Sequence, residues 1–179
     1  MIITAKQFYK AWFEAVTEMK SSLAPSWRNA PVFTKLIKSS GDCVIRRVAD
    51  KVSLKCYPTD YYSLDAVLYE DSDLVPSAPA GSTWLRSMSV AFEHENFIKS
   101  GVYKEVSHLL LTSADLRVLV AYPEDGITDD VWIEMHKLIR GSRYEQRISE
   151  EQSFLLIFGG EVGYEWEAYV YKTADWARL

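Results

Sequence analysis

The segment 116–122, Leu-Arg-Val-Leu-Val-Ala-Tyr, constrains the fold of this 179-residue chain more than any other. It carries apolar side chains on both faces and ends at Pro123. Such a strand must be covered on both faces, as in the centre of a parallel or mixed sheet. Residues 101–112 have the apolar spacing of a helix that Ser100 could cap, and a helix there would make a crossover between parallel strands. The sequence therefore predicts an α/β fold with a mixed central sheet of five or six strands, flanked by helices.

The segment 87–96, before that helix, has the pattern of a strand and carries Glu93 and Glu95 near its end. Side chains alternate in a strand, so Glu93 and Glu95 share one face and His94 takes the other. Two like charges this close are costly unless a cation lies between them, and a divalent metal bound through oxygen atoms is the usual partner. The alternative is a polar strand end that leaves the sheet into solvent.

A third acid lies upstream. Residues 51–57 and 61–70 are predicted to be two strands joined by a turn at 58–60, and Asp65 lies within the second, between apolar neighbours. Burying this carboxylate requires a partner, which could be an Arg or Lys on a neighbouring element. An acid on one strand followed by Glu-x-Glu at the end of the next predicts three carboxylates converging on one edge of the sheet.

The order helix, three strands, helix, strand resembles the core of the PD-(D/E)xK nuclease superfamily, which has the restriction-endonuclease-like fold. The resemblance covers roughly residues 3–123. Asp65 matches the family's first acid and Glu93 its second, while Glu95 stands where the family usually has lysine. In this respect the chain is similar to type II restriction enzymes that carry Glu-x-Glu.

The resemblance implies a metal-dependent, endonuclease-like phosphodiester hydrolase that acts on nucleic acid. Asp65, Glu93 and Glu95 would be both catalytic residues and ligands of Mg²⁺ or Mn²⁺, with the main-chain carbonyl of His94 as a further oxygen ligand. Glu95 would orient or deprotonate the attacking water, or help to hold a second metal. The alternatives are a catalytically inactive domain of this fold that serves as a regulatory or protein-interaction module, and a metal-stabilised domain without a substrate.

The charge balance gives nucleic-acid binding little support. The chain has 20 basic and 25 acidic residues and a net charge of −5, whereas nucleic-acid binders usually show a basic surface. Two local clusters could hold a phosphate backbone: Arg46, Arg47, Lys51 and Lys55, and Arg140, Arg143 and Arg147, the latter spaced as on one helical face. Both clusters are better explained as solvated surfaces crossed by ion pairs.

Composition predicts a single cytoplasmic domain over residues 1–179. A hydrophobic content of 48% is enough for a sizeable core, and neither a membrane span nor a signal peptide is recognisable. Cys43 and Cys56 are expected to be reduced thiols. The three histidines have no zinc-ligand spacing and are expected to be ordinary surface or packed residues. A nucleic-acid partner and a homodimer are both compatible with this composition, and a membrane partner is not expected.

The other predicted elements depend on familiar local signals. Thr4 and Gln7 form a capping box before a first helix with Phe8 and Trp12 on its apolar stripe. Further helices are predicted over 29–40, 42–50 and 128–143. A closing antiparallel hairpin is predicted from 153–158 and 164–172, and a Pro- and Ser-rich loop over 71–82 links the two acid-bearing strands.

Overall fold

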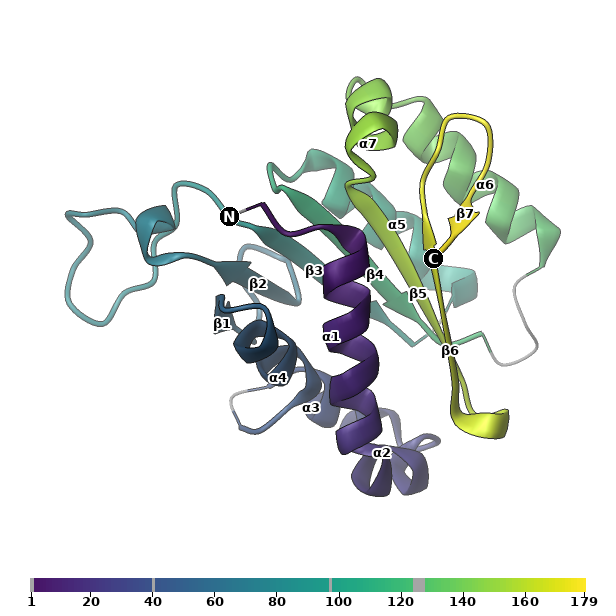
Figure 1. Ribbon diagram of the computed structural model, residues 1–179, viewed down its shortest axis with the longest axis horizontal. Helices are drawn as coiled ribbons and strands as arrows, with labels where there is room; N and C mark the ends of the chain where they lie inside the picture. Colours follow the sequence, from purple (N-terminus) through teal and green to yellow (C-terminus); the bar gives the residue numbers. More distant parts are fainter. Residues whose placement is uncertain (1, 40, 97, 124–127) are drawn as a thin grey trace.

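A seven-stranded mixed sheet runs through the middle of the computed structural model, which describes residues 2–39, 41–96, 98–123 and 128–179 (Figure 1). The strands are β1 (Lys55–Tyr57), β2 (Ala66–Tyr69), β3 (Val90–Glu95), β4 (Leu116–Ala121), β5 (Phe154–Gly160), β6 (Glu165–Val170) and β7 (Ala177–Arg178). They follow one another across the sheet in chain order. Strands β3, β4 and β5 are parallel, and the other neighbouring pairs are antiparallel. The predicted α/β class with a mixed central sheet is confirmed.

Helices cover both faces of this sheet. One face carries α1 (Ala5–Glu18), α2 (Lys20–Ser26), α3 (Ala30–Ile37) and α4 (Val44–Lys51). The other carries α5 (Ile98–Leu111), α6 (Asp129–Arg140) and α7 (Glu145–Glu151). Two short 3₁₀ turns, η1 (Asp71–Asp73) and η2 (Val162–Tyr164), complete the described elements. In Figure 1, α1 crosses in front of the sheet and α5 lies behind it, so each face has its own hydrophobic core.

The central strand is β4, as predicted. Every residue of β4 is buried, and α5 makes the crossover that brings β4 parallel to β3. The one charged residue in β4, Arg117, is also buried. Its guanidinium donates hydrogen bonds to the main-chain carbonyls of Leu109 (2.9 Å), Thr112 (2.8 Å) and Ala114 (3.2 Å) at the end of α5. A cation at this position binds main-chain carbonyls where the helix ends and complements the helix dipole.

The first helix and the closing hairpin also agree with the predictions. The Thr4–Gln7 capping box begins α1, and Phe8 and Trp12 are fully buried. Strands β5 and β6 form the antiparallel hairpin, and β7 extends its edge. The predicted loop between the acid-bearing strands is longer than expected, because β2 ends at Tyr69 and β3 begins at Val90. It projects from the edge of the sheet (Figure 1).

The predicted strands before this loop were too long. Helix α4 continues to Lys51, and β1 begins only at Lys55. Residues 61–64 form a closed turn, in which the main-chain groups of Tyr61 and Leu64 exchange hydrogen bonds of 2.8 and 3.0 Å. Tyr62 and Ser63 have positive φ angles of 49° and 73°, which a strand cannot contain. The prediction that Asp65 lies inside a strand is therefore wrong, because β2 begins at the next residue.

Several predicted helix boundaries also shift. The predicted helix 29–40 is α3, and the Asn29 side chain caps it by accepting a hydrogen bond from the Val32 N–H (3.4 Å). Helix α5 begins at Ile98, so Ser100 is not its cap. The predicted helix 128–143 ends at Arg140, and a turn separates it from α7. The unpredicted helices, α2 and α7, have seven residues each.

Among the residues that the structure describes, no helix has the length and apolar character that a membrane crossing requires.

Candidate metal and catalytic site

The acid pair of β3 lies at the carboxyl end of a parallel strand, where open α/β sheets commonly bind ligands. Glu93 is opposite Leu119 of β4 and Glu95 is opposite Ala121, so both lie on the α5 face, as the alternation predicts. The Glu93 side chain is only 1% exposed, whereas Glu95 is half-buried. His94 takes the other face and packs against Tyr122, with ring centroids 5.1 Å apart. The chain thus places one acid inside the protein and one near its surface.

Asp65 lies beside Glu93 even though it precedes β2. The Asp65 main-chain N–H donates to Glu93 Oε2 at 3.3 Å. In return, the main-chain N–H of His94 donates to Asp65 Oδ2 at 2.9 Å. Both bonds run from a main-chain donor to a side-chain oxygen, and they hold Asp65 beside Glu93 just beyond the last β2–β3 pair, Ala66 and Phe92. Two of the three predicted carboxylates are therefore neighbours.

A lysine from another element pairs with Asp65. Lys38 directly follows α3, and its ammonium forms an ion pair with Asp65 Oδ1. Both side chains are about one-fifth exposed. Asn96 helps to fix α3 at this end of β3, because its side-chain amide donates to Thr34 Oγ at 3.1 Å. The structure thus shows Asp65 paired with a Lys on a neighbouring element, one of the partners that the sequence analysis allowed. It also brings a lysine to the acids, although Glu95 occupies the usual lysine position.

Helix α5 adds two side chains that the sequence analysis missed. Glu105 and His108 are three residues apart and face Glu93. His108 Nδ1 lies 3.3 Å from Glu105 Oε2 and 3.5 Å from Glu93 Oε1. One ligand atom from each of the three residues lies within 4.8 Å of the others, so this group could hold a metal ion. The sequence does carry a signal for these two residues, the spacing Glu-x-x-His on the helix after the acids. Metal sites built from carboxylates on helices use this spacing.

Burial controls the protonation of the acid at the centre. Desolvation, together with the negative charges of Asp65 and Glu105, raises the pKa of Glu93 from its ordinary 4.5 to about 9. On the opposite face, burial lowers the pKa of His94 to about 3, and the Lys38 charge acts in the same direction. His94 is therefore a neutral, packed residue at physiological pH.

The residues that form the metal-competent group differ from the predicted set. Both carboxylate oxygens of Asp65 are engaged, one by Lys38 and the other by the His94 N–H. In the part of the chain that the structure describes, the group of ligand atoms that could share one ion contains Glu93 but neither Asp65 nor Glu95. The roles of Asp65, Glu95 and the His94 carbonyl as ligands stay predictions.

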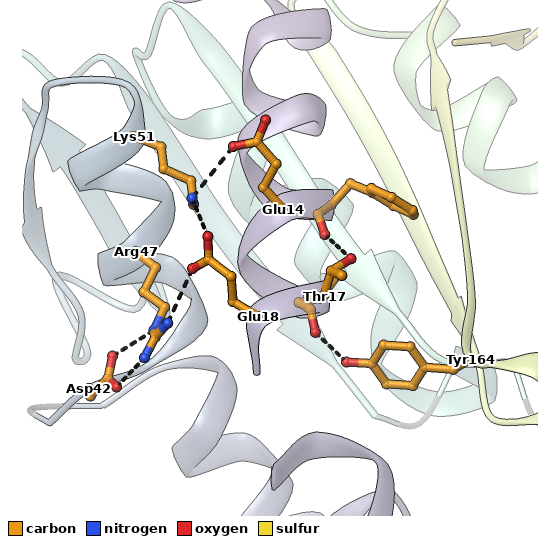
Figure 2. A network of polar contacts seen from close by, with 9 residues as sticks. Glu14, Thr17, Glu18, Asp42, Arg47, Lys51 and Tyr164 are labelled. Carbon is orange, nitrogen blue, oxygen red and sulfur yellow. Dashed lines mark hydrogen bonds and ion pairs between the residues drawn. The ribbon is translucent and has the colours of Figure 1, made fainter. Parts of the chain in front are cut away.

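The first basic cluster is largely neutralised by ion pairs (Figure 2). Lys51 points between Glu14 and Glu18 of α1, with its Nζ 3.4 and 2.6 Å from their oxygens. Arg47 bridges Glu18 and Asp42 at 3.1 and 2.6 Å. This agrees with the interpretation of the cluster as a surface crossed by ion pairs.

The second basic cluster does not form one helical face. Arg140 ends α6, Arg143 lies in the turn that follows, and Arg147 belongs to α7. Arg147 pairs with Glu151 of its own helix at 2.9 Å. The spacing argument for a shared phosphate-binding face is therefore wrong.

Neither cysteine forms a disulfide. Cys43 is buried and Cys56 is half-buried, and both are free thiols, as predicted. Burial raises the pKa of Cys56 to about 12, so its thiolate is scarce at neutral pH. A reactive cysteine needs the opposite shift.

Comparisons of the chain with protein families, with curated proteins and with solved structures gave no match. The resemblance to PD-(D/E)xK nucleases therefore rests on the order of elements and on the acids at the end of β3. What the structure does establish is the mixed α/β fold and the buried group of Glu93, Glu105 and His108.

Proposed function

We propose that this chain is a metal-dependent hydrolase of nucleic-acid phosphodiester bonds, with Asp65, Glu93 and Glu95 as its catalytic residues. One observation carries the proposal. Glu93 is buried beside Asp65 at the carboxyl end of a parallel strand, and its Oε1 has no hydrogen-bond partner among the described residues. A buried carboxylate oxygen without a donor is costly unless a proton or a cation occupies the site.

The acids would suit a divalent metal if Asp65 exchanged its ion pair with Lys38 for the ion. Asp65 and Glu93 would then hold it, with Glu95 near the surface on the same face of the sheet. A bound Mg²⁺ or Mn²⁺ would supply Lewis-acid stabilisation of the phosphate and a lower pKa of coordinated water. Glu95 is half-buried, so its carboxylate can accept a proton from a water molecule at the mouth of the site.

We propose that Lys38 takes the role of the lysine that the resembled nucleases usually carry where this chain has Glu95. Its ammonium offsets the charge of Asp65 and lies at the same end of the sheet as the acids. If Asp65 held a metal, the Lys38 ammonium would be available to the negative charge of a phosphate. Lys38→Met should therefore lower cleavage, whereas Lys38→Arg should retain part of it.

The second candidate is a non-catalytic interaction module. The net charge of −5 and the ion pairs of Arg47 and Lys51 favour it, because they leave little unpaired positive charge for a phosphate backbone in that region. On this proposal the partner is a protein, or a second copy of the chain in a homodimer.

A cleavage assay distinguishes the two candidates. The purified protein is incubated with single- and double-stranded DNA and RNA in Mg²⁺ or Mn²⁺, alongside Glu93→Gln and Asp65→Asn. Asp71→Asn is the matched control, since Asp71 is an exposed acid paired only with Lys55 among the contacts described. Wild type and Asp71→Asn should cleave, and the two site variants should lose at least about 100-fold in rate.

Activity that persists in Glu93→Gln would identify a contaminating nuclease. If the wild-type protein cleaves none of the substrates in either metal, the catalytic proposal is wrong and the interaction module is favoured.

A further inference from the structure

Helix α5 presents Glu105 and His108 to Glu93, and the proposed hydrolysis uses neither of them. We propose that Glu93, Glu105 and His108 bind one divalent transition metal, such as Mn²⁺, Co²⁺ or Zn²⁺, in preference to Mg²⁺. This inference deepens the proposed function, because it shares Glu93 with the catalytic acids and names the metal that the site would take. It departs from the expectation that a metal here has oxygen ligands only and that the histidines are ordinary surface or packed residues.

The spacing of the ligand atoms suits one small ion. Two ligands that each lie about 2.1 Å from a metal are about 3.0 Å apart at right angles and about 3.4 Å apart in a tetrahedral arrangement. His108 Nδ1 lies 3.3 Å from Glu105 Oε2 and 3.5 Å from Glu93 Oε1. Small side-chain rotations would therefore be enough to bring the three atoms to bonding distance of a shared ion.

Unpartnered buried atoms independently indicate a missing ligand. Glu93 Oε1 belongs to a side chain that is 1% exposed, and it makes no hydrogen bond to any described residue. The His108 side chain is 29% exposed, but its Nδ1 atom is buried and also has no hydrogen bond in the described part of the chain. The other oxygen of Glu105 lies 3.5 Å from the Lys104 ammonium, so Oε2 is the oxygen turned to the site. A cation between these atoms would satisfy both unpartnered groups at once.

The imidazole ligand determines the preference among metals. Histidine nitrogen suits transition metals, whereas Mg²⁺ is bound through oxygen and retains several water molecules. The Glu93 and Glu105 side chains are only 1% and 12% exposed, so an ion bound by them would have to give up much of its hydration shell, which Mg²⁺ does reluctantly. Both features favour a transition metal over Mg²⁺.

Calorimetric titration of the EDTA-treated full chain with Mn²⁺, Zn²⁺ and Mg²⁺ tests the site. We expect one equivalent of Mn²⁺ or Zn²⁺ to bind at least about tenfold more tightly than Mg²⁺. His108→Gln and Glu105→Gln should each weaken Mn²⁺ and Zn²⁺ binding by about tenfold or more and should reduce the preference over Mg²⁺. Glu134→Gln, an exposed acid on α6 that pairs with Lys137, is the matched control and should bind as wild type does.

The inference is overturned if wild type binds neither Mn²⁺ nor Zn²⁺, if it binds Mg²⁺ as tightly, or if His108→Gln binds like wild type. Pulsed electron paramagnetic resonance of the Mn²⁺-loaded wild-type protein covers the case in which a variant misfolds. A coupling to imidazole nitrogen supports the site, and its absence overturns it. None of these measurements requires cleavage, so the nuclease proposal can fail while the metal site is confirmed. If the protein does not bind the metals, the site is wrong even if His108→Gln leaves cleavage unchanged.

Discussion

At the scale of single residues, Glu93 is an acid whose ionised form the folded protein strongly disfavours. It faces the carboxylates of Asp65 and Glu105, and the ring of His108 is its nearest basic neighbour. Burial raises its pKa to about 9, so the folded protein holds a proton that the unfolded chain releases near pH 4.5. The resulting stabilisation is complete below pH 4.5 and is lost as the pH rises through 9.

We therefore predict a pH-dependent effect of Glu93→Gln in metal-free buffer. The free energy of unfolding of wild type should fall between pH 5 and pH 9 relative to that of the variant, which stays neutral. The difference should grow by on the order of 3 kcal/mol in favour of Glu93→Gln. Urea denaturation at several pH values measures it, with Glu134→Gln as the control. A difference that does not change with pH would show that Glu93 is ionised in the folded protein.

At the scale of elements, two aromatic rings pack closely against Gly159 in the β5–β6 hairpin. A Cβ built on Gly159 would lie 2.8 Å from the Trp166 ring and 2.9 Å from the Tyr122 ring. Both rings belong to the aromatic core under α1 and α2, so neither can move without disturbing its neighbours. At Gly160, the nearest atoms would be 3.9 Å away.

Gly159→Ala should therefore lower the free energy of unfolding by about 2 kcal/mol or more, because the added methyl group overpacks the core. Gly160→Ala has room for its methyl group and should change stability by less than about 1 kcal/mol. Chemical denaturation of the two variants and wild type provides the comparison. Equal stability of the two alanine variants would mean that the Tyr122 and Trp166 rings yield more easily than their packing suggests.

Helix α5 also explains which parts of the site could be predicted. The alternation of β3 was enough to place Glu93 and Glu95 on one face, because a strand fixes its side chains locally. Glu105 and His108 look like ordinary polar residues of an amphipathic helix. Their position against Glu93 depends on how α5 packs on the sheet, which sequence periodicity does not specify.

At the scale of the whole molecule, the sheet was predictable and its edge was not. The apolar run of β4 and the hairpin of β5 and β6 carry strong periodic signals, and both were predicted correctly. The turn at residues 61–65, just before β2, was not predicted. Tyr62 and Ser63 have left-handed conformations there, and no glycine in the sequence signals them. Arg117 was also missed as a buried cation, since its partners are main-chain carbonyls at the end of α5.

Both proposals require a divalent metal to bind at Glu93, between β3 and α5. Anomalous diffraction from crystals of the wild-type protein grown with Mn²⁺ locates the metal without any assumption about activity. We predict one strong peak within about 2.5 Å of a Glu93 carboxylate oxygen, with ligands drawn from Asp65, Glu105 and His108. No peak at Glu93, or a Mn²⁺ ion bound only at surface acids far from β3, would contradict the claim.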